Sequence, residues 1–588
     1  MTSQDVANVR ASQSRTRKLE AQGPCQSPSD GVVVSTWGRE RSHGERRSQT
    51  MSILNDTRMY ARFLWGLRGY VRNTITLEEA QAAVRQRMAQ REANFLRLVR
   101  RGIFGYPRSP YLPLLKLAGC ELGDIENLVR QKGLEGTLLT LRESGVYFTF
   151  EEFKGREPIV RGGQVISARP TDFNNPFLSH YYYVESGGST GAGTRVPTDL
   201  DHMAANAGTL MLGLDAHGTL GMPTAFWHGV LPDSSGPNAV LRHVRCGEVV
   251  HKWFSPTMPG DLRPSFKNRL ANQLIVSLGQ LYGAPIPAPE PVHLDEAAVV
   301  ARWMAQAVQT YGGCVLRAQV SKALRVCLAA REEGIDLAGA IFMGGGEPPT
   351  PAKVREIRGS GAGWVPTYYF TEVGAVGWGC AQPVDINDLH LFRDSLALIQ
   401  YPRRVPGSDI TVDAFHFTSL LPTAPKLMLN VESDDYGVIE TRSCGCPLET
   451  YGFTEHLRHV KSFRKLTGEG VTLVGSEMVH VLEEVLPTRF GGSPLDYQLL
   501  EEEDAQGFTR LSLVVSPRVE IADEAEVVQT VLEALGHGSD AADQARALWS
   551  QASSLRVKRT EPVWTSRGKL MPLRLARSSR SPTDSSPD

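Results

Sequence analysis

Residues 182–200 constrain the fold of this chain more than any other stretch. An aromatic and β-branched run ends at Val184 and Glu185, and nine small residues, Ser186–Thr194, follow it. This pattern predicts a strand that leads into a loop rich in glycine and hydroxyl groups. Because glycine permits positive φ and close backbone approach, such a loop can present N–H groups and hydroxyls to an oxyanion. We therefore predict a phosphate-binding loop, with a plain surface loop as the alternative.

The loop does not fit the Walker type of phosphate site. Gly188 and Gly193 have the Walker spacing, but that motif continues with Lys and then Ser or Thr. Thr194 and Arg195 stand there instead. The Walker interpretation therefore fails at the residue that carries the charge.

Length and composition describe a large soluble chain. At 588 residues it exceeds one ordinary core, so we expect at least two domains. Basic and acidic residues nearly balance, 63 against 64, which gives no overall electrostatic reason to bind nucleic acid. No apolar run reaches the roughly 18 residues of a membrane span. Eight cysteines in so long a chain do not indicate a disulfide scaffold, and we expect a cytoplasmic protein.

The domain boundaries follow composition and periodicity. Residues 1–50 are poor in apolar side chains and are predicted to be a disordered tail, and so are residues 576–588. Charge and glycine content rise near 460–470, which separates a large domain, 51–462, from a small one, 463–575. A long helix is expected over 76–101, and alternating strands and helices after it favour an α/β class with mixed sheets. The small domain is predicted to be α+β, with helices at 474–486 and 524–535 and strands at 497–501 and 510–516.

Two further strands end in residues suited to nucleotide chemistry. The run 340–343 leads into Gly344–Pro348, and the run 364–370 leads into Thr371 and Glu372. Strand ends are where α/β sheets present functional groups, and Mg²⁺ takes one or two carboxylate ligands. A solvated glutamate is the alternative. Farther along, Asp434 or Asp435 offers a carboxylate that could accept ribose hydroxyls, or the pair could form a turn.

Three cysteines and one histidine have the composition of a structural zinc site. They are Cys380, His390, Cys444 and Cys446. Three thiolates and an imidazole match tetrahedral Cys3His coordination, and Gly445 permits the bend between the last two cysteines. The spacing is not a strong finger signature, so unligated buried thiols are the alternative.

Taken in order, these motifs resemble the adenylate-forming, AMP-binding superfamily, and in particular its phenylacetate–CoA ligase-like branch. Ser186–Thr194 is similar to the loop Ser-Ser-Gly-Thr-Thr-Gly-Lys-Pro-Thr, with Ala192 and Gly193 in place of Lys and Pro. Tyr369–Gly374 is similar to the Tyr-Gly-x-Thr-Glu segment, with Phe replacing Gly. Gly568 and Lys569 are similar to the terminal Gly-Lys loop. The domain boundary departs from the family's hinge sequence, so the hinge residue stays open.

The resemblance implies a role for each motif. Thr371 would contact the α-phosphate, Glu372 would hold Mg²⁺, and Lys569 would bridge the carboxylate and the α-phosphate during adenylation. Trp227 and His228 would border the acyl pocket, and Cys380, His390, Cys444 and Cys446 would hold zinc. The residues implied to bind ATP or AMP are Ser186, Gly188, Ser189, Thr190, Gly191, Thr194, Gly345, Gly346, Glu347, Tyr369, and Asp434 or Asp435.

The implied protein is an α/β enzyme, with a large adenylate-forming domain and a small mobile α+β domain. It would use ATP and Mg²⁺ to convert an acid, of aryl or arylacetyl type, to an acyl-adenylate, and would then transfer the acyl group to CoA. One alternative acceptor is a carrier protein, a protein side chain or an amine. Another alternative is a non-catalytic, zinc-stabilised interaction module.

Overall fold

The computed structural model describes residues 57–185, 195–256, 266–347, 349, 351–404, 411–462, 465–468, 471–474, 481–492, 496–503, 509–535, 555–563 and 573–575. One unit, Arg58–Asp588, contains all of them except Thr57. The predicted phosphate loop Ser186–Thr194 and the predicted catalytic Lys569 lie outside the described residues. Within the described ranges, no helix is long and apolar enough to cross a membrane.

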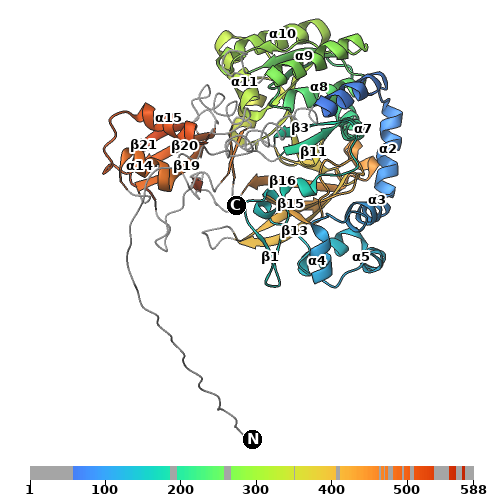
Figure 1. The fold of residues 1–588 in the computed structure, drawn as a ribbon. Helices are drawn as coiled ribbons and strands as arrows, with labels where there is room; N and C mark the ends of the chain where they lie inside the picture. Colours follow the sequence, from blue (N-terminus) through green and yellow to red (C-terminus); the bar gives the residue numbers. More distant parts are fainter. Residues whose placement is uncertain are drawn as a thin grey trace, which may run out of the picture. The chain divides into compact units, whose positions relative to one another are not determined.

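A mixed sheet of 12 strands organises the described part of the large domain (Figure 1). Its parallel half runs in the order β10-β9-β8-β5-β6-β7, and its antiparallel half continues from β10 as β11-β12-β16-β15-β14-β13. This arrangement confirms the predicted α/β class. The strands are β5 Thr224–Trp227, β6 Val250–Ser255, β7 Glu290–Pro291, β8 Cys314–Gln319, β9 Ala340–Gly345, β10 Gly363–Phe370, β11 Gly374–Gly379, β12 Leu389–Leu391, β13 Leu396–Arg404, β14 Thr411–Ser419, β15 Val431–Thr441 and β16 Glu455–Ser462.

Helices cover both halves of this sheet. Helices α10 and α11 pack against β8, α12 packs against β10, and α5 packs against β13. The main helices are α2 Leu77–Ala89, α3 Arg91–Leu98, α4 Tyr111–Leu117, α5 Leu122–Glu143, α6 Phe150–Lys154, α7 Leu200–Ala216, α8 Ser235–Arg245, α9 Phe266–Leu281, α10 Ala297–Tyr311, α11 Val320–Glu333 and α12 Pro351–Gly359.

The helix predicted over 76–101 is two helices. Thr76 begins α2 through a capping box with Glu79, as its sequence suggests. Gln90 leaves helical geometry, at φ −106° and ψ 15°, and separates α2 from α3. A π-helical turn, Val99–Phe104, then follows α3. Met88 and Phe95 lie seven residues apart, in phase on either side of Gln90, so periodicity alone did not reveal the break.

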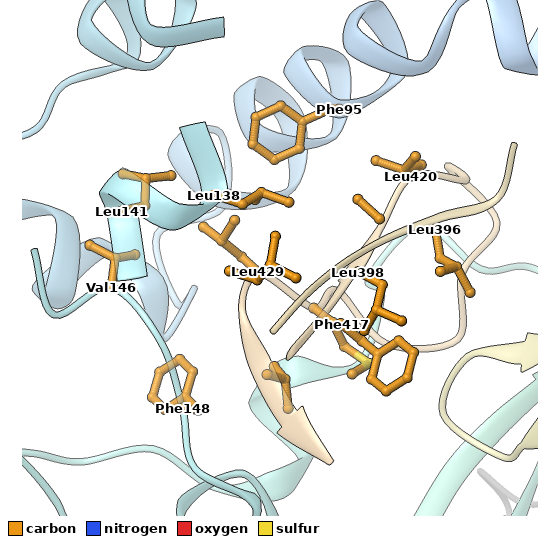
Figure 2. Close-up of a cluster of buried hydrophobic side chains, with 14 of the residues drawn as sticks. Phe95, Leu138, Leu141, Val146, Phe148, Leu396, Leu398, Phe417, Leu420 and Leu429 are labelled. Atoms are coloured by element: carbon orange, nitrogen blue, oxygen red, sulfur yellow. The ribbon is translucent and has the colours of Figure 1, made fainter. Parts of the chain in front are cut away.

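The antiparallel half has its own apolar core (Figure 2). Phe95 on α3 and Leu138 on α5 lie over Leu398 on β13 and Phe417 on β14, and all four side chains are almost completely buried. Burial of side chains this large supplies about 1.5–3 kcal/mol each. Val431, the first residue of the strand β15 that carries Asp434 and Asp435, belongs to the same core.

A hairpin flanks the predicted phosphate loop. Strand β3, Tyr181–Glu185, pairs antiparallel with β4, Arg195–Asp199, so that Glu185 lies opposite Arg195. Asp199 then caps α7 by accepting hydrogen bonds from the backbone N–H groups of Asp201 and His202. The predicted strand before the loop is therefore confirmed.

The C-terminal part is a separate α+β arrangement. Its four strands have the order β21-β20-β19-β22, and α15, Glu524–Leu535, coincides with the predicted helix. The strands are β19 Tyr497–Glu503, β20 Thr509–Val515, β21 Leu555–Arg559 and β22 Leu573–Leu575.

The other predicted helix of this part is displaced along the sequence. Val474 ends strand β18, Val471–Val474, and the described helical turns are Val481–Val485 and α14, Leu486–Phe490. The prediction over 474–486 was therefore wrong at its start, because Val471–Val474 pairs in a hairpin with β17, Lys465–Gly468. The predicted boundaries 51–462 and 463–575 stay predictions.

Tyr111→Phe tests the packing of the antiparallel half. The Tyr111 hydroxyl accepts a hydrogen bond from the N–H of Leu429 at 2.9 Å and donates one to the Leu427 carbonyl at 3.2 Å. Its loss leaves a buried N–H unsatisfied, so we expect the free energy of unfolding to fall by about 1–3 kcal/mol in denaturant titration. Tyr311→Phe, at a position 64% exposed, is the control and should change little.

Candidate active site

Two glycines at the end of β9 allow strands and loop to approach closely. A Cβ at Gly345 would lie 2.0 Å from the Thr367 carbonyl oxygen on β10. Gly346, the next residue, has a φ of +81°. Because both positions exclude side chains, the loop after β9 lies directly beside the end of β10, where Tyr369 is half-buried.

Glu347 stabilises this loop from within. Its carboxylate accepts hydrogen bonds from the backbone N–H and the hydroxyl of Ser321, both at 2.7 Å, and pairs with Lys353 at 3.3 Å. Glu347 is only 6% exposed. The predicted nucleotide contact of the Gly-Gly-Glu segment is therefore more readily made by the loop backbone than by this carboxylate.

Thr371 and Glu372 form the turn between β10 and β11. Glu372 is buried and pairs with Lys154, which comes from the end of α6. Burial raises the pKa of Glu372, but the ammonium groups of Lys154 and Lys426 outweigh it, so the net pKa lies below its ordinary value. An ionised carboxylate at this turn is the donor that Mg²⁺ requires, and Thr371 places a hydroxyl one residue away.

A buried histidine supports the same turn. His202 Nε2 donates a hydrogen bond to the carbonyl oxygen of Val373 at 3.0 Å, and a Cβ at Gly374 would lie 2.9 Å from that nitrogen. Burial lowers the pKa of His202 to about 4, so the ring is neutral at pH 7. Sequence reasoning missed His202 and Lys154, because neither belongs to a motif near the turn.

Asp434 and Asp435 both lie in strand β15, which excludes the turn alternative. Asp435 accepts hydrogen bonds from the Tyr368 hydroxyl at 2.6 Å and from the Ser462 hydroxyl at 2.5 Å. Asp434 is completely buried at φ +62°. Tyr368 belongs to β10, so the structure brings the predicted ribose-binding segment into contact with the strand that leads into Thr371 and Glu372.

The two residues predicted to border the acyl pocket lie in different surroundings. Trp227 is completely buried, and its indole N–H donates to the Val292 carbonyl oxygen at 3.2 Å. His228 is half-buried and follows the end of β5. Trp227 therefore packs in the core, and His228 remains the residue of this pair that could meet a substrate.

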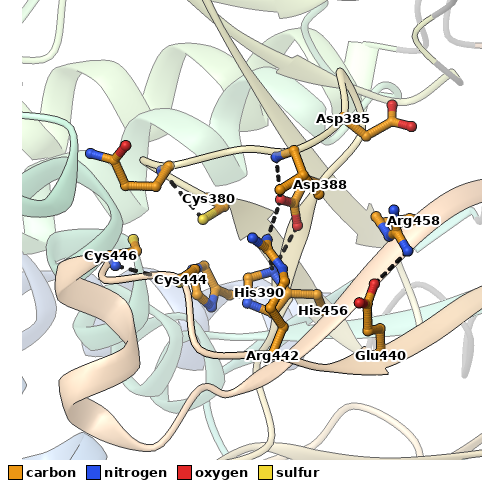
Figure 3. Close-up of polar contacts among 12 residues, drawn as sticks. Cys380, Asp385, Asp388, His390, Glu440, Arg442, Cys444, Cys446, His456 and Arg458 are labelled. Carbon is orange, nitrogen blue, oxygen red and sulfur yellow. Dashed lines mark hydrogen bonds and ion pairs between the residues drawn. The ribbon is translucent and has the colours of Figure 1, made fainter.

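The structure brings together the four predicted zinc ligands (Figure 3). Cys380 follows β11, His390 lies on β12, and Cys444 and Cys446 follow β15. Their ligand atoms all lie within 4.8 Å of one another. Tetrahedral zinc with Zn–S bonds of about 2.3 Å places its sulfur ligands about 3.8 Å apart, so the four side chains fit this ion.

Hydrogen bonds prepare these side chains for a metal. His390 Nδ1 donates to the Phe453 carbonyl oxygen at 2.6 Å, which leaves Nε2 as the ligating nitrogen, 3.7 Å from Cys444 Sγ. Hydrogen bonding from Cys380 lowers the pKa of Cys446, and the backbone N–H of Ala381 also donates to that sulfur. A thiolate is the form that binds zinc.

A buried charged network adjoins the cysteine cluster. Asp388 accepts a hydrogen bond from His456 Nδ1 at 2.7 Å and pairs with Arg442 at 2.5 Å (Figure 3). The His390 and His456 rings lie 4.2 Å apart. Asp388 and His456 carried no recognised spacing in the sequence.

The described part of this chain has the adenylate-forming ligase fold. It combines the mixed sheet, the helices on its two halves and the C-terminal α+β arrangement. The structure is similar to a crystal structure of 2-hydroxyisobutyryl-CoA ligase in complex with 2-HIB-AMP and CoA in the thioesterification state. The TM-score is 0.51 and the sequence identity 16%, over 83% of this chain and 90% of the other. A second structure of that ligase, in the postadenylation state with R3-HIB-AMP, gives a TM-score of 0.41 and 14% identity, over 85% and 90% of the two chains. No protein-family model and no curated protein matches the sequence.

Cys446→Ser tests the metal cluster. We expect the purified protein to contain about one zinc per chain by elemental mass spectrometry, and the variant to lose most of it and to melt at lower temperature. Cys120→Ser, a half-buried thiol outside the cluster, is the control. Equal zinc content in both variants would contradict the assignment.

The neutral His202 predicts a dependence of stability on pH. An unfolded histidine titrates near pH 6.5, whereas His202 in the folded state titrates near 4. Between these values the unfolded state binds more protons, so stability falls as the pH falls. From pH 7 to 5 this residue should account for about 1–2 kcal/mol of the loss in unfolding free energy. His202→Asn should reduce that loss, and His459→Asn, at an exposed position, should not.

Proposed function

We propose that this protein uses ATP to convert a carboxylic acid to an acyl-adenylate and then transfers the acyl group to the thiol of CoA. The observation that carries the proposal is the edge at the ends of β9 and β10. There a glycine loop, the Thr371–Glu372 turn and the Tyr368–Asp435 contact lie together. They do so in a fold shared with a ligase crystallised with 2-HIB-AMP and CoA.

The chemistry assigns a role to each group. A carboxylate oxygen of the acid bonds to the α-phosphorus of ATP, the bond to the bridging oxygen breaks, and pyrophosphate leaves. Thr371 donates to the α-phosphate, and Lys569 offsets the repulsion between the two anions. Glu372 is the residue that would hold Mg²⁺, which when bound neutralises phosphate charge. The thiolate then attacks the acyl carbon, and AMP leaves.

The finer assignments are also proposals. The Ser186–Thr194 loop restrains the leaving phosphates, and Asp435 holds the ribose hydroxyls with Tyr368 beside it. Zinc on Cys380, His390 and the two later cysteines joins the segment after β11 to the segment after β15. The phenylacetate–CoA ligase-like motifs support an aryl or arylacetyl acid. A carrier protein in place of CoA is the alternative acceptor.

Carboxylate-dependent exchange of labelled pyrophosphate into ATP tests the first step. The panel contains aryl, arylacetyl and fatty acids and their dicarboxylic analogues. We expect exchange with one class, and a loss of about 100-fold or more in Lys569→Ala and in Glu372→Gln, because each removes charge stabilisation of the transition state. Glu356→Gln, at a half-buried glutamate that pairs with Arg331 at 2.9 Å, is the matched control.

Two outcomes would redirect the proposal. No exchange with any acid, from folded and zinc-replete protein, would contradict adenylation and support the non-catalytic interaction module. Release of AMP that depends on a carrier protein, and not on CoA, would retain adenylation and replace the acceptor.

A further inference from the structure

A charged residue interrupts the apolar centre of the parallel sheet. Arg317 lies on β8 between Leu316 and Ala318, opposite Phe226 on β5, and is only 6% exposed. Its guanidinium carbon lies 5.2 Å from the centre of the Trp378 ring and 5.8 Å from that of Phe226. A central parallel strand is ordinarily apolar throughout, so this arginine needs an explanation.

A second guanidinium lies in the same place. Arg242, from α8, lies 4.8 Å from the centre of the Tyr369 ring, and Tyr369 also interacts electrostatically with Arg317. Burial lowers the pKa of His228, and the charges of Lys322, Arg317 and Arg242 lower it further. Lys322 also donates to the Trp227 carbonyl oxygen at 3.3 Å. Positive charge therefore gathers between the predicted acyl segment and the end of β10.

Among the side chains that the structure describes, no carboxylate forms an ion pair with either arginine, and Arg242 Nε donates to the Asn238 carbonyl oxygen at 3.1 Å. The partly buried Arg87, by contrast, pairs with Asp394 at 2.7 Å. Burial and the nearby Arg242 lower the pKa of Arg317, although Tyr369 partly opposes them. Keeping the Arg317 guanidinium charged therefore costs solvation free energy. Aromatic faces offset only part of this cost. An anionic group of a ligand would offset the remainder.

We propose that Arg317 and Arg242 bind a second anionic group on the acid substrate, so that the preferred acids are dianionic. This inference rests on the proposed function and specifies its substrate class. One carboxylate would react near Thr371 on the β10–β11 turn. Strand β8 lies next to β5, about 5 Å from the strand that leads into His228, whereas the Arg317 guanidinium itself lies against Trp378 on β11 and interacts with Tyr369 on β10. The neighbouring acyl segment favours the far end of the acid, and the test below distinguishes it from a phosphate of ATP beside Tyr369.

Pyrophosphate exchange with matched acids tests the proposal. The pairs are pentanoate against glutarate, and phenylacetate against 2-carboxyphenylacetate. We expect the dianion of at least one pair to have a kcat/KM ten-fold or more above its partner. Arg317→Gln should reduce that ratio about 10- to 100-fold, the range for a lost charge-assisted hydrogen bond, and Arg317→Lys should restore it in part. Arg302→Gln, at an exposed arginine, should keep the wild-type ratio.

Other outcomes would overturn the proposal. An unchanged ratio with a raised KM for ATP in Arg317→Gln would assign the arginines to a phosphate. If Arg317→Gln does not fold, the test uses Arg242→Gln, because Arg242 is half-buried. The proposal then requires that this variant lower the dianion-to-monoanion ratio of kcat/KM, and an unchanged ratio would contradict it.

Calorimetric titration of glutarate into the ATP-free protein separates this inference from the proposed function. Saturable binding that weakens ten-fold or more in Arg317→Gln would uphold the anion site even if no acid supports exchange. The absence of both binding and a dianion preference would overturn it.

Discussion

The close contact of backbone between β8, β9 and β10 is the constraint on which the candidate site depends. A Cβ at Gly344 would lie 2.2 Å from the Ala318 carbonyl oxygen, and one at Gly345 would lie 2.0 Å from that of Thr367. Glycine at both positions lets the three parallel strands end at one edge. The loop with Gly346, the side chain of Tyr369 and the following turn then come together without further adjustment.

Long-range polar contacts hold the turn that carries Thr371 and Glu372. Lys154 pairs with Glu372 from more than 200 residues away in the sequence, and His202 holds the Val373 carbonyl. Burial lowers the pKa of Lys426 to about 7, and its charge in turn lowers the pKa of Glu372. A turn held by contacts from two distant segments can present its hydroxyl and carboxylate in a defined geometry.

The two halves of the sheet contribute different chemistry. The parallel half supplies strand ends and the Arg317 cluster, whereas the antiparallel half supplies Asp435 and the cysteine ligands. Tyr368 connects the halves through its 2.6 Å hydrogen bond to Asp435. A nucleotide bound at this edge would thus contact groups from both halves, and zinc would stabilise the segments that carry them.

The sequence by itself determined the α/β class, the strand before the hydroxyl-rich loop, the strand that leads into Thr371 and the composition of the cysteine cluster. These are local patterns of periodicity, turn residues and ligand type, which act over a few residues. Only the tertiary structure decided that Glu372 meets Lys154, that Trp227 packs in the core, that Asp435 meets Tyr368, and that Arg317 and Arg242 lie together. Those contacts join residues 65 to 218 positions apart, and their formation depends on strand order and side-chain packing, which no local pattern specifies.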